Sequence, residues 1–165
     1  MASLLRSIAE RWRDNAVLID PTTGVPFARV FTGRVPQTEL YKFPYVSILV
    51  SQGYSRKRTD KTRYSHSPVT FHLWVDEDHL EFAETLAAKI ADAYADTCWK
   101  LTETDKVIDF LDEGEPLVHQ TNLPNVKAWE VVKLFTAVIE RARVDRDAEC
   151  CVETPAADES DADLD

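Results

Sequence analysis

The sequence has little glycine, and this scarcity excludes the common nucleotide-binding loops. Only four glycines occur in 165 residues, at positions 24, 33, 53 and 114, and each is isolated. A Walker loop or a dinucleotide fingerprint needs two or three glycines within a few residues, so that the backbone can approach the phosphates. We therefore expect no chemistry driven by a nucleotide.

Cysteine and long apolar runs are also scarce. The three cysteines are Cys98, Cys150 and Cys151, an odd number with no CxxC spacing, which argues against a disulfide framework and against a zinc site. No run of about 18 apolar residues occurs, and charged residues interrupt positions 6–13, so neither a membrane helix nor a signal peptide is predicted. These features favour a soluble protein made in a reducing cytoplasm, with no membrane partner.

Catalytic and metal-binding patterns are missing as well. The histidines, His66, His72, His79 and His119, form no pair on a helix face and have no cysteine at ligand spacing. The acidic clusters do not pair carboxylates in a way that acid–base chemistry requires. Cys98 follows a predicted helix with no base near it, so a packed thiol is expected. We predict no enzyme activity, no metal and no cofactor.

The negative charge is concentrated in one segment. Residues 145–165 contain nine acids and one base, which gives −8 of the formal net charge of −10. This segment has too few apolar side chains to form a core, so we predict a folded domain over 1–144 and a disordered acidic C-terminal tail over 145–165. The tail either keeps the protein soluble or occupies a basic surface until a partner displaces it.

The positive charge is concentrated in the stretch SRKRTDKTR, residues 55–63. Its cations are Arg56, Lys57, Arg58, Lys61 and Arg63, against the single acid Asp60. The stretch lies between two predicted strands, so it forms the tip of a long basic β-hairpin that is either simply solvated or binds a partner. As the partner we favour an acidic protein surface over DNA, because no aromatic residues alternate with the cations as in single-strand binding surfaces.

Apolar periodicity predicts two helices. In residues 3–12, Leu4, Leu5, Ile8 and Trp12 recur every three or four positions and form one apolar stripe. Residues 76–96 contain a longer amphipathic pattern, whose acidic start suits the positive end of a helix dipole. The N-terminal helix is expected to pack on the longer one.

Alternation with a period of two predicts a mainly antiparallel β-sheet. Strands are expected within residues 27–35, 45–52 and 68–75. The last two of these form the long basic hairpin. Residues 106–121 are predicted as two strands that turn at 113–116. The pattern of residues 126–141 fits a helix or a strand, and its β-branched content favours a long final strand, so the fold class is α+β.

This order of elements resembles the phage tail-completion and tail-terminator family, the lambda-type ring proteins of the head–tail junction. One point of resemblance is the linker from Pro36 to Pro44, which leads into the strand PYVSILV. The other is the stretch LWVDEDHLEFAETLAAKI, in which an aromatic and acidic joint leads from a strand directly into a helix. The resemblance covers residues 1–143 and leaves the acidic tail outside.

The resemblance implies a structural virion protein without enzymatic activity that forms a cyclic ring, usually a hexamer, capping the tail tube and joining the tail to the head. Its partners are then copies of itself, the tail tube protein and the head–tail connector or neck protein, with transient contact to genomic DNA in the channel. A ring needs a head-to-tail contact between two different surfaces. Tyr64 and Trp74 are expected as exposed aromatics of the subunit interface. The protein is made in the host cytoplasm and is expected in the tail or neck of the virion.

A second hypothesis comes from a different class of protein. In this hypothesis the chain is a nucleic-acid-associated binding module, whose basic hairpin over residues 55–63 binds phosphates while the acidic tail competes with them. Phosphate binding weakens steeply with salt, so a salt titration separates the two hypotheses.

Overall fold

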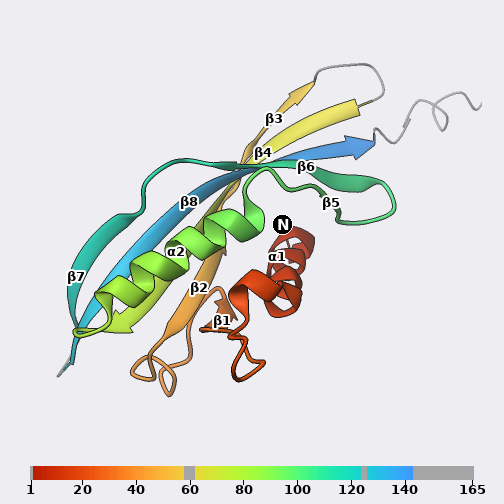
Figure 1. Ribbon diagram of the computed structural model, residues 1–165. Coiled ribbons are helices and arrows are strands. Elements are labelled where there is room, and N and C mark those ends of the chain that lie inside the picture. The colour runs from red at the N-terminus through yellow and green to blue at the C-terminus, as the bar shows by residue number, and fades with distance from the viewer. Residues whose placement is uncertain (1, 58–61, 124–125, 143–165) are drawn as a thin grey trace, which may run out of the picture.

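A central pair of long antiparallel strands organises the structure, a computed structural model that describes residues 2–57, 62–123 and 126–142. Strands β4 (Thr62–Asp76) and β8 (Val126–Ala142) pair continuously, from Thr62 opposite Ala142 to Asp76 opposite Ala128. The other described strands are added on either side of this pair (Figure 1). The predicted α+β class and the mainly antiparallel sheet are confirmed.

The remaining strands complete the sheet in the order β1-β2-β4-β8-β6-β5. Strands β2 and β3 lie one after the other along the free side of β4, and β6 and β7 do the same along β8. Among the described strands only β1 and β2 are parallel. Their bounds are β1 Arg29–Thr32, β2 Tyr45–Val50, β3 Tyr54–Lys57, β5 Trp99–Lys100, β6 Asp105–Asp112 and β7 Leu117–Leu123.

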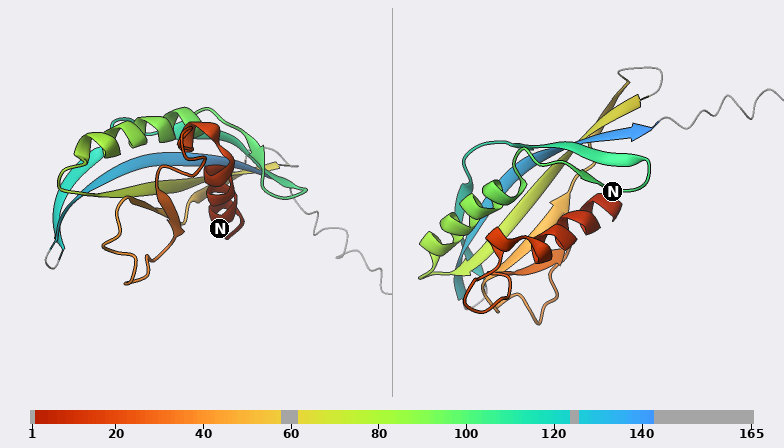
Figure 2. Two further views of the ribbon diagram at one scale, coloured as in Figure 1. Left: turned by 60° about the horizontal axis from the view of Figure 1, so that its bottom comes forward. Right: turned by 45° about the vertical axis from the view of Figure 1, so that its right-hand side comes forward.

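Helices α1 (Ala2–Asp14) and α2 (Leu80–Tyr94) contribute to a core on one face of this sheet, and a short 3-10 helix, η1 (Ala16–Leu18), follows α1. Helix α2 lies along β4 and β8, as Figure 2 shows. Helix α1 lies mainly against β1 and β2 and meets the end of α2, where the Tyr94 hydroxyl donates a hydrogen bond to the Ile8 carbonyl at 2.8 Å.

The core forms between the helices and the sheet because both present an apolar face. On β4 the odd-numbered residues from Val69 to Val75 are buried, as expected for side chains that alternate between the two faces of a strand. Trp12 of α1 stacks on Phe71 of β4 with 6.2 Å between the ring centroids. Helix α2 contributes Ala83, Leu86, Ala87, Ile90 and Tyr94. Burial of this apolar surface supplies the main favourable free energy of folding, about 25 cal/mol per Å².

The basic hairpin differs from the sequence prediction. The strands predicted within 45–52 and 68–75 pair antiparallel, but most of the expected long tip is a ladder between β3 and residues 63–66 of β4. The core-facing positions in this half of β4 are Ser65 and Ser67, which are buried. Because these residues are polar, the apolar alternation begins only at Val69, and it does not predict the first half of the strand.

Strands β6 and β7 do not turn back on each other at residues 113–116, so this prediction is wrong. Both strands run in the same direction along β8, β6 beside residues 135–141 and β7 beside residues 126–132. At the break, the Lys133 ammonium of β8 donates to the Gly114 carbonyl and lies 2.7 Å from Asp112 Oδ1. The glycine- and proline-containing stretch interrupts an edge of the sheet without reversing the chain.

The long final strand predicted over 126–141 is confirmed as β8.

The prediction of a packed Cys98 thiol is wrong, because Cys98 is exposed. Its neighbour Trp99 turns inward instead: the indole Nε1 donates to Ser7 Oγ at 2.6 Å, and the indole ring lies 5.5 Å from the Phe110 ring. The acidic tail predicted over 145–165 lies outside the described residues.

Candidate functional site: two interaction surfaces

The face of the sheet opposite the α1 and α2 core carries exposed leucines. Cross-strand register places Leu49 of β2 and Leu134 of β8 on either side of Thr70, with their side chains on the same face. These two side chains are 42% and 38% exposed. By the same register, Leu111 lies opposite Thr136 and Leu117 opposite Val132. We call the surface formed by Leu49, Leu111, Leu117 and Leu134 the uncovered face.

An aromatic stack borders the uncovered face. Tyr45 lies between Phe43 and Trp74, with ring centroids 5.7 and 6.1 Å away and nearly parallel ring planes. Phe31 of β1 contacts the same tyrosine edge to face at 6.0 Å. Burial raises the pKa of Tyr45 to about 12, and the nearby Glu130 carboxylate adds to this shift. The tyrosine therefore stays neutral at physiological pH and acts as a packing residue.

A groove of about 490 Å³ lies between the loop after β1 and the uncovered face. Leu49, Trp74 and Leu40 give it apolar walls, and Arg34 contributes an exposed cation. His72 Nδ1 lies 2.6 Å from Glu130 Oε1 inside this groove. The groove therefore offers an apolar surface with a few polar groups, as interaction surfaces do.

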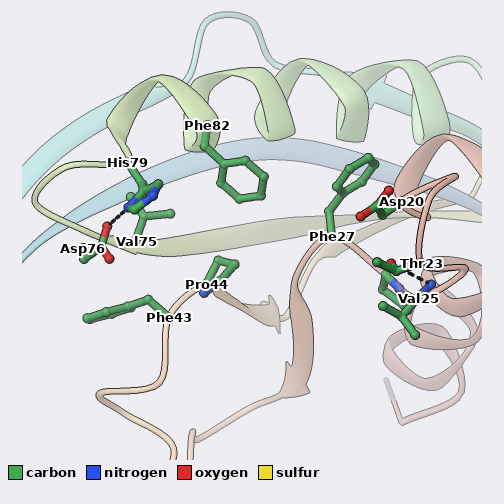
Figure 3. Close-up of a pocket in the computed structure, with 11 residues that line it drawn as sticks. Asp20, Thr23, Val25, Phe27, Phe43, Pro44, Val75, Asp76, His79 and Phe82 are labelled. Carbon is green, nitrogen blue, oxygen red and sulfur yellow. Dashed lines mark hydrogen bonds and ion pairs between the residues drawn. The ribbon is translucent and has the colours of Figure 1, made fainter.

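A second hollow, of about 510 Å³, lies between the segments that precede β1 and β2, the end of β4 and the start of α2 (Figure 3). Phe27, Phe43 and Phe82 line it together with Pro44. His79 is hydrogen-bonded to Asp76 at its rim. Its lining contains no serine or cysteine, and the one hydroxyl, from Thr23, accepts a hydrogen bond from the backbone N–H of Val25. Nothing in this lining pairs a nucleophile with a base.

The second surface is the hairpin end, where the predicted basic residues fall. Arg63 was predicted at the tip, but it lies within β4 and is exposed. It stands opposite Lys57 of β3 on one side and Arg141 of β8 on the other. Arg56 also belongs to β3, whereas the predicted residues Arg58 and Lys61 lie outside the described residues. We call the row of Lys57, Arg63 and Arg141 the cation row.

Two acidic residues of the described part of the chain, Asp105 and Glu140, lie beside the cation row. The Arg141 Nε atom is 3.8 Å from Asp105 Oδ2, at the limit of an ion pair. Lys106 and Glu140 pair more closely, at 2.7 Å. The hydrogen bond to Glu140 raises the pKa of Lys106. Within the described ranges, no carboxylate lies within ion-pair distance of Arg63.

Tyr64 and Trp74, the predicted interface aromatics, are half-buried and not fully exposed. Both lie on the uncovered face of the sheet, but they are ten positions apart along β4, about 33 Å at the usual rise per residue. Sequence reasoning missed Leu49 and Leu134, although both alternate with core residues. Their exposure depends on which face the helices leave uncovered, and strand periodicity alone does not give that.

The part of the chain that the structure describes contains no group of three histidine, cysteine or acidic residues that could hold a metal ion. Its helices are all too short or too polar to cross a membrane.

No model of a known protein family matches the chain, and no curated protein has significant similarity to it.

Proposed function

We propose that the protein is a structural ring subunit of a phage virion, which caps the tail tube and joins the tail to the head or neck. The uncovered face carries this proposal. A sheet with a core on one face and leucines exposed on the other has apolar surface available for a permanent contact. The resemblance of the Pro36–Pro44 linker and of the strand-to-helix joint to the tail-terminator family suggests that this contact forms a ring at the head–tail junction.

The sheet also offers two different edges. Among the described strands, β1 pairs only with β2, and β7 pairs only with β8. Edge strands present unpaired backbone groups that favour contact with another chain. A closed ring needs a head-to-tail contact in which one surface of a subunit meets a different surface of the next. The two edges formed by β1 and β7 are different surfaces on opposite sides of the sheet, so they meet this requirement.

In this proposal the basic hairpin end contacts an acidic surface of the tail tube or the connector. The end is well placed for such a role, because β3, β4 and β8 hold it away from the helices (Figure 1). Charged contacts of this kind favour rapid and selective association more than high affinity. The protein needs no enzymatic activity for any of these steps.

The nucleic-acid-associated module is the second candidate, and the cation row is the observation that favours it. Three cations stand in register across three strands, and lysine and arginine are the residues that most often contact phosphates. A salt titration with a DNA duplex tests it, since binding through several phosphates weakens by orders of magnitude between 50 and 200 mM salt, roughly 10³-fold or more.

The ring proposal is tested by sedimentation velocity and electron microscopy of the purified full chain, alone and mixed with tail tubes lacking their cap. We expect a closed oligomer, either in solution or on the tube ends. A chain that stays monomeric and unbound in the presence of tubes contradicts the proposal. Steeply salt-dependent DNA binding without a ring supports the second candidate instead.

A further inference from the structure

We propose that the acidic segment 145–165 binds the hairpin end of its own chain, with the cation row as its docking surface. The chain leaves β8 at Ala142, and Ala142 stands opposite Thr62, the first residue of β4. The acidic segment therefore begins at Asp145, three positions after Ala142 at the hairpin end. This inference is independent of the ring proposal.

Charge complementarity identifies the occupant. Residues 145–165 carry nine acids and one base, whereas residues 55–63 carry five cations and one acid. The cation row brings Lys57 and Arg63 into register with Arg141, the penultimate residue of β8. Arg63 has no carboxylate partner among the described residues, so this cation is available to the segment.

Covalent attachment favours the contact by raising the effective concentration of the segment at the hairpin end. The 23 residues after Ala142 span at most about 80 Å when fully extended. Ala142 stands opposite Thr62, the neighbour of Arg63, so the segment is long enough to reach the cation row. A short tether of this kind gives an effective concentration in the millimolar range. Exposed ion pairs are individually weak, so several carboxylates must act together, and salt must weaken the contact.

The consequence is self-masking of the hairpin end. While the segment is bound, a competing anion or an acidic protein surface has to displace it before reaching the cation row. The segment then acts as an internal competitor, which lowers the affinity of the free protein for nonspecific polyanions. A partner surface that makes additional contacts overcomes this competition.

Zero-length carbodiimide cross-linking of the full chain tests the contact, because it joins a carboxylate to a lysine only when the two touch. We expect cross-links from residues 145–165 to Lys57 at low salt, at a yield that does not depend on protein concentration and that falls in about 0.5 M salt. The variant Arg63→Gln/Arg141→Gln keeps Lys57 as the reporter and should lower the yield several-fold.

The matched control is Lys42→Gln/Lys127→Gln, which removes two exposed cations remote from the hairpin end in the sheet and should leave the yield unchanged. Equal cross-linking to Lys57 and to Lys127 in the unmodified chain contradicts the proposal. Cross-links that form only between chains, with a yield that rises with concentration, also overturn it.

A binding measurement supplies the functional test. The probe is a fluorescent peptide of twenty glutamates, titrated against the full chain and against a full-length variant whose nine acids in 145–165 are replaced by Asn or Gln. We expect the neutralised variant to bind the probe at least about tenfold more tightly, because the internal competitor is lost. Equal affinities for the two proteins overturn the self-masking.

Discussion

Lys133 of β8 and Asp112 of β6 form an ion pair of 2.7 Å at the point where β6 ends and the sheet edge is interrupted. The lysine side chain is only 6% exposed, and its ammonium also binds the Gly114 carbonyl. A single buried cation from the central strand thus binds both the end of β6 and the stretch that follows it, where the neighbouring edge is interrupted.

Replacing Lys133 with methionine should destabilise the protein by about 1–3 kcal/mol, because the Asp112 carboxylate and the Gly114 carbonyl lose a charged donor. Urea unfolding measures the change. The matched control is Lys127→Met, which removes an exposed ion pair to Glu77 of 3.2 Å and should change the free energy of unfolding by less than about 1 kcal/mol. Equal losses in the two variants contradict a special role for Lys133.

The free energy of unfolding should fall as the pH rises from about 10 to about 12. Burial raises the pKa of Tyr45 from its usual 10.0 to about 12 and raises the pKa of Tyr94 as well. Above pH 10 the unfolded chain ionises these tyrosines while the folded protein keeps them neutral, so unfolding becomes easier. Tyr45→Phe should flatten this pH dependence in urea titrations. An unchanged slope contradicts the assignment to Tyr45.

Gly53→Ala should cost about 1–3 kcal/mol or more, since an added methyl group meets the backbone carbonyl of His66. Gly53 lies between β2 and β3, where the backbone passes close to β4. Gly24→Asn is the control, because that site is open and asparagine tolerates its φ of 69°. Thermal unfolding compares the two. A loss at Gly24 as large as that at Gly53 rules out the close contact as the cause.

The double substitution Leu49→Gln/Leu134→Gln should reduce ring formation or tube binding while leaving the fold nearly intact. Both side chains are partly exposed, so each should change the free energy of unfolding by about 0.5 kcal/mol or less. Sedimentation and a thermal melt provide the two readouts. Val17→Gln, at an exposed apolar residue away from the uncovered face, should assemble normally. Normal assembly of the double variant removes the uncovered face from the interface.

Replacing Arg56, Lys57, Arg58, Lys61 and Arg63 with glutamine should weaken attachment to the tail tube or neck without preventing ring formation. Exposed substitutions of this kind usually change the free energy of unfolding by about 0.5 kcal/mol or less. Incorporation of the variant into tails is the measurement, with ring size as the control. Normal incorporation indicates a merely solvated hairpin end, whereas loss of the ring indicates that the charge belongs to the subunit interface.

The sequence predicted long regular elements better than the places where they break. The pattern of residues 126–141 fits a helix as well, but its β-branched content correctly favoured the strand that β8 forms. In β4 the same method fails before Val69, because the buried residues are Ser65 and Ser67 and carry no hydrophobic signal. A pattern of hydrophobicity does not detect small polar residues that face the interior.

The break between β6 and β7 illustrates a second limit. Gly114 and Pro116 correctly indicate a local interruption. Whether the chain then reverses or continues depends on β8, whose Lys133 binds Asp112 at the end of β6 and, 19 residues away in the sequence, Gly114. The candidate interaction surfaces depend on tertiary structure in the same way, since the leucines are exposed only because both helices pack on the other face.

The uninterrupted pairing of β4 with β8 has a mechanical consequence. Both strands run from the hairpin end to the opposite side of the sheet, next to the start of α2. A pull on β4 at the hairpin end that is resisted by β8 at its opposite end loads their cross-strand hydrogen bonds in shear, so that many bonds share the force at once instead of opening one by one. The strand pair is therefore suited to transmit tension across the subunit with little extension.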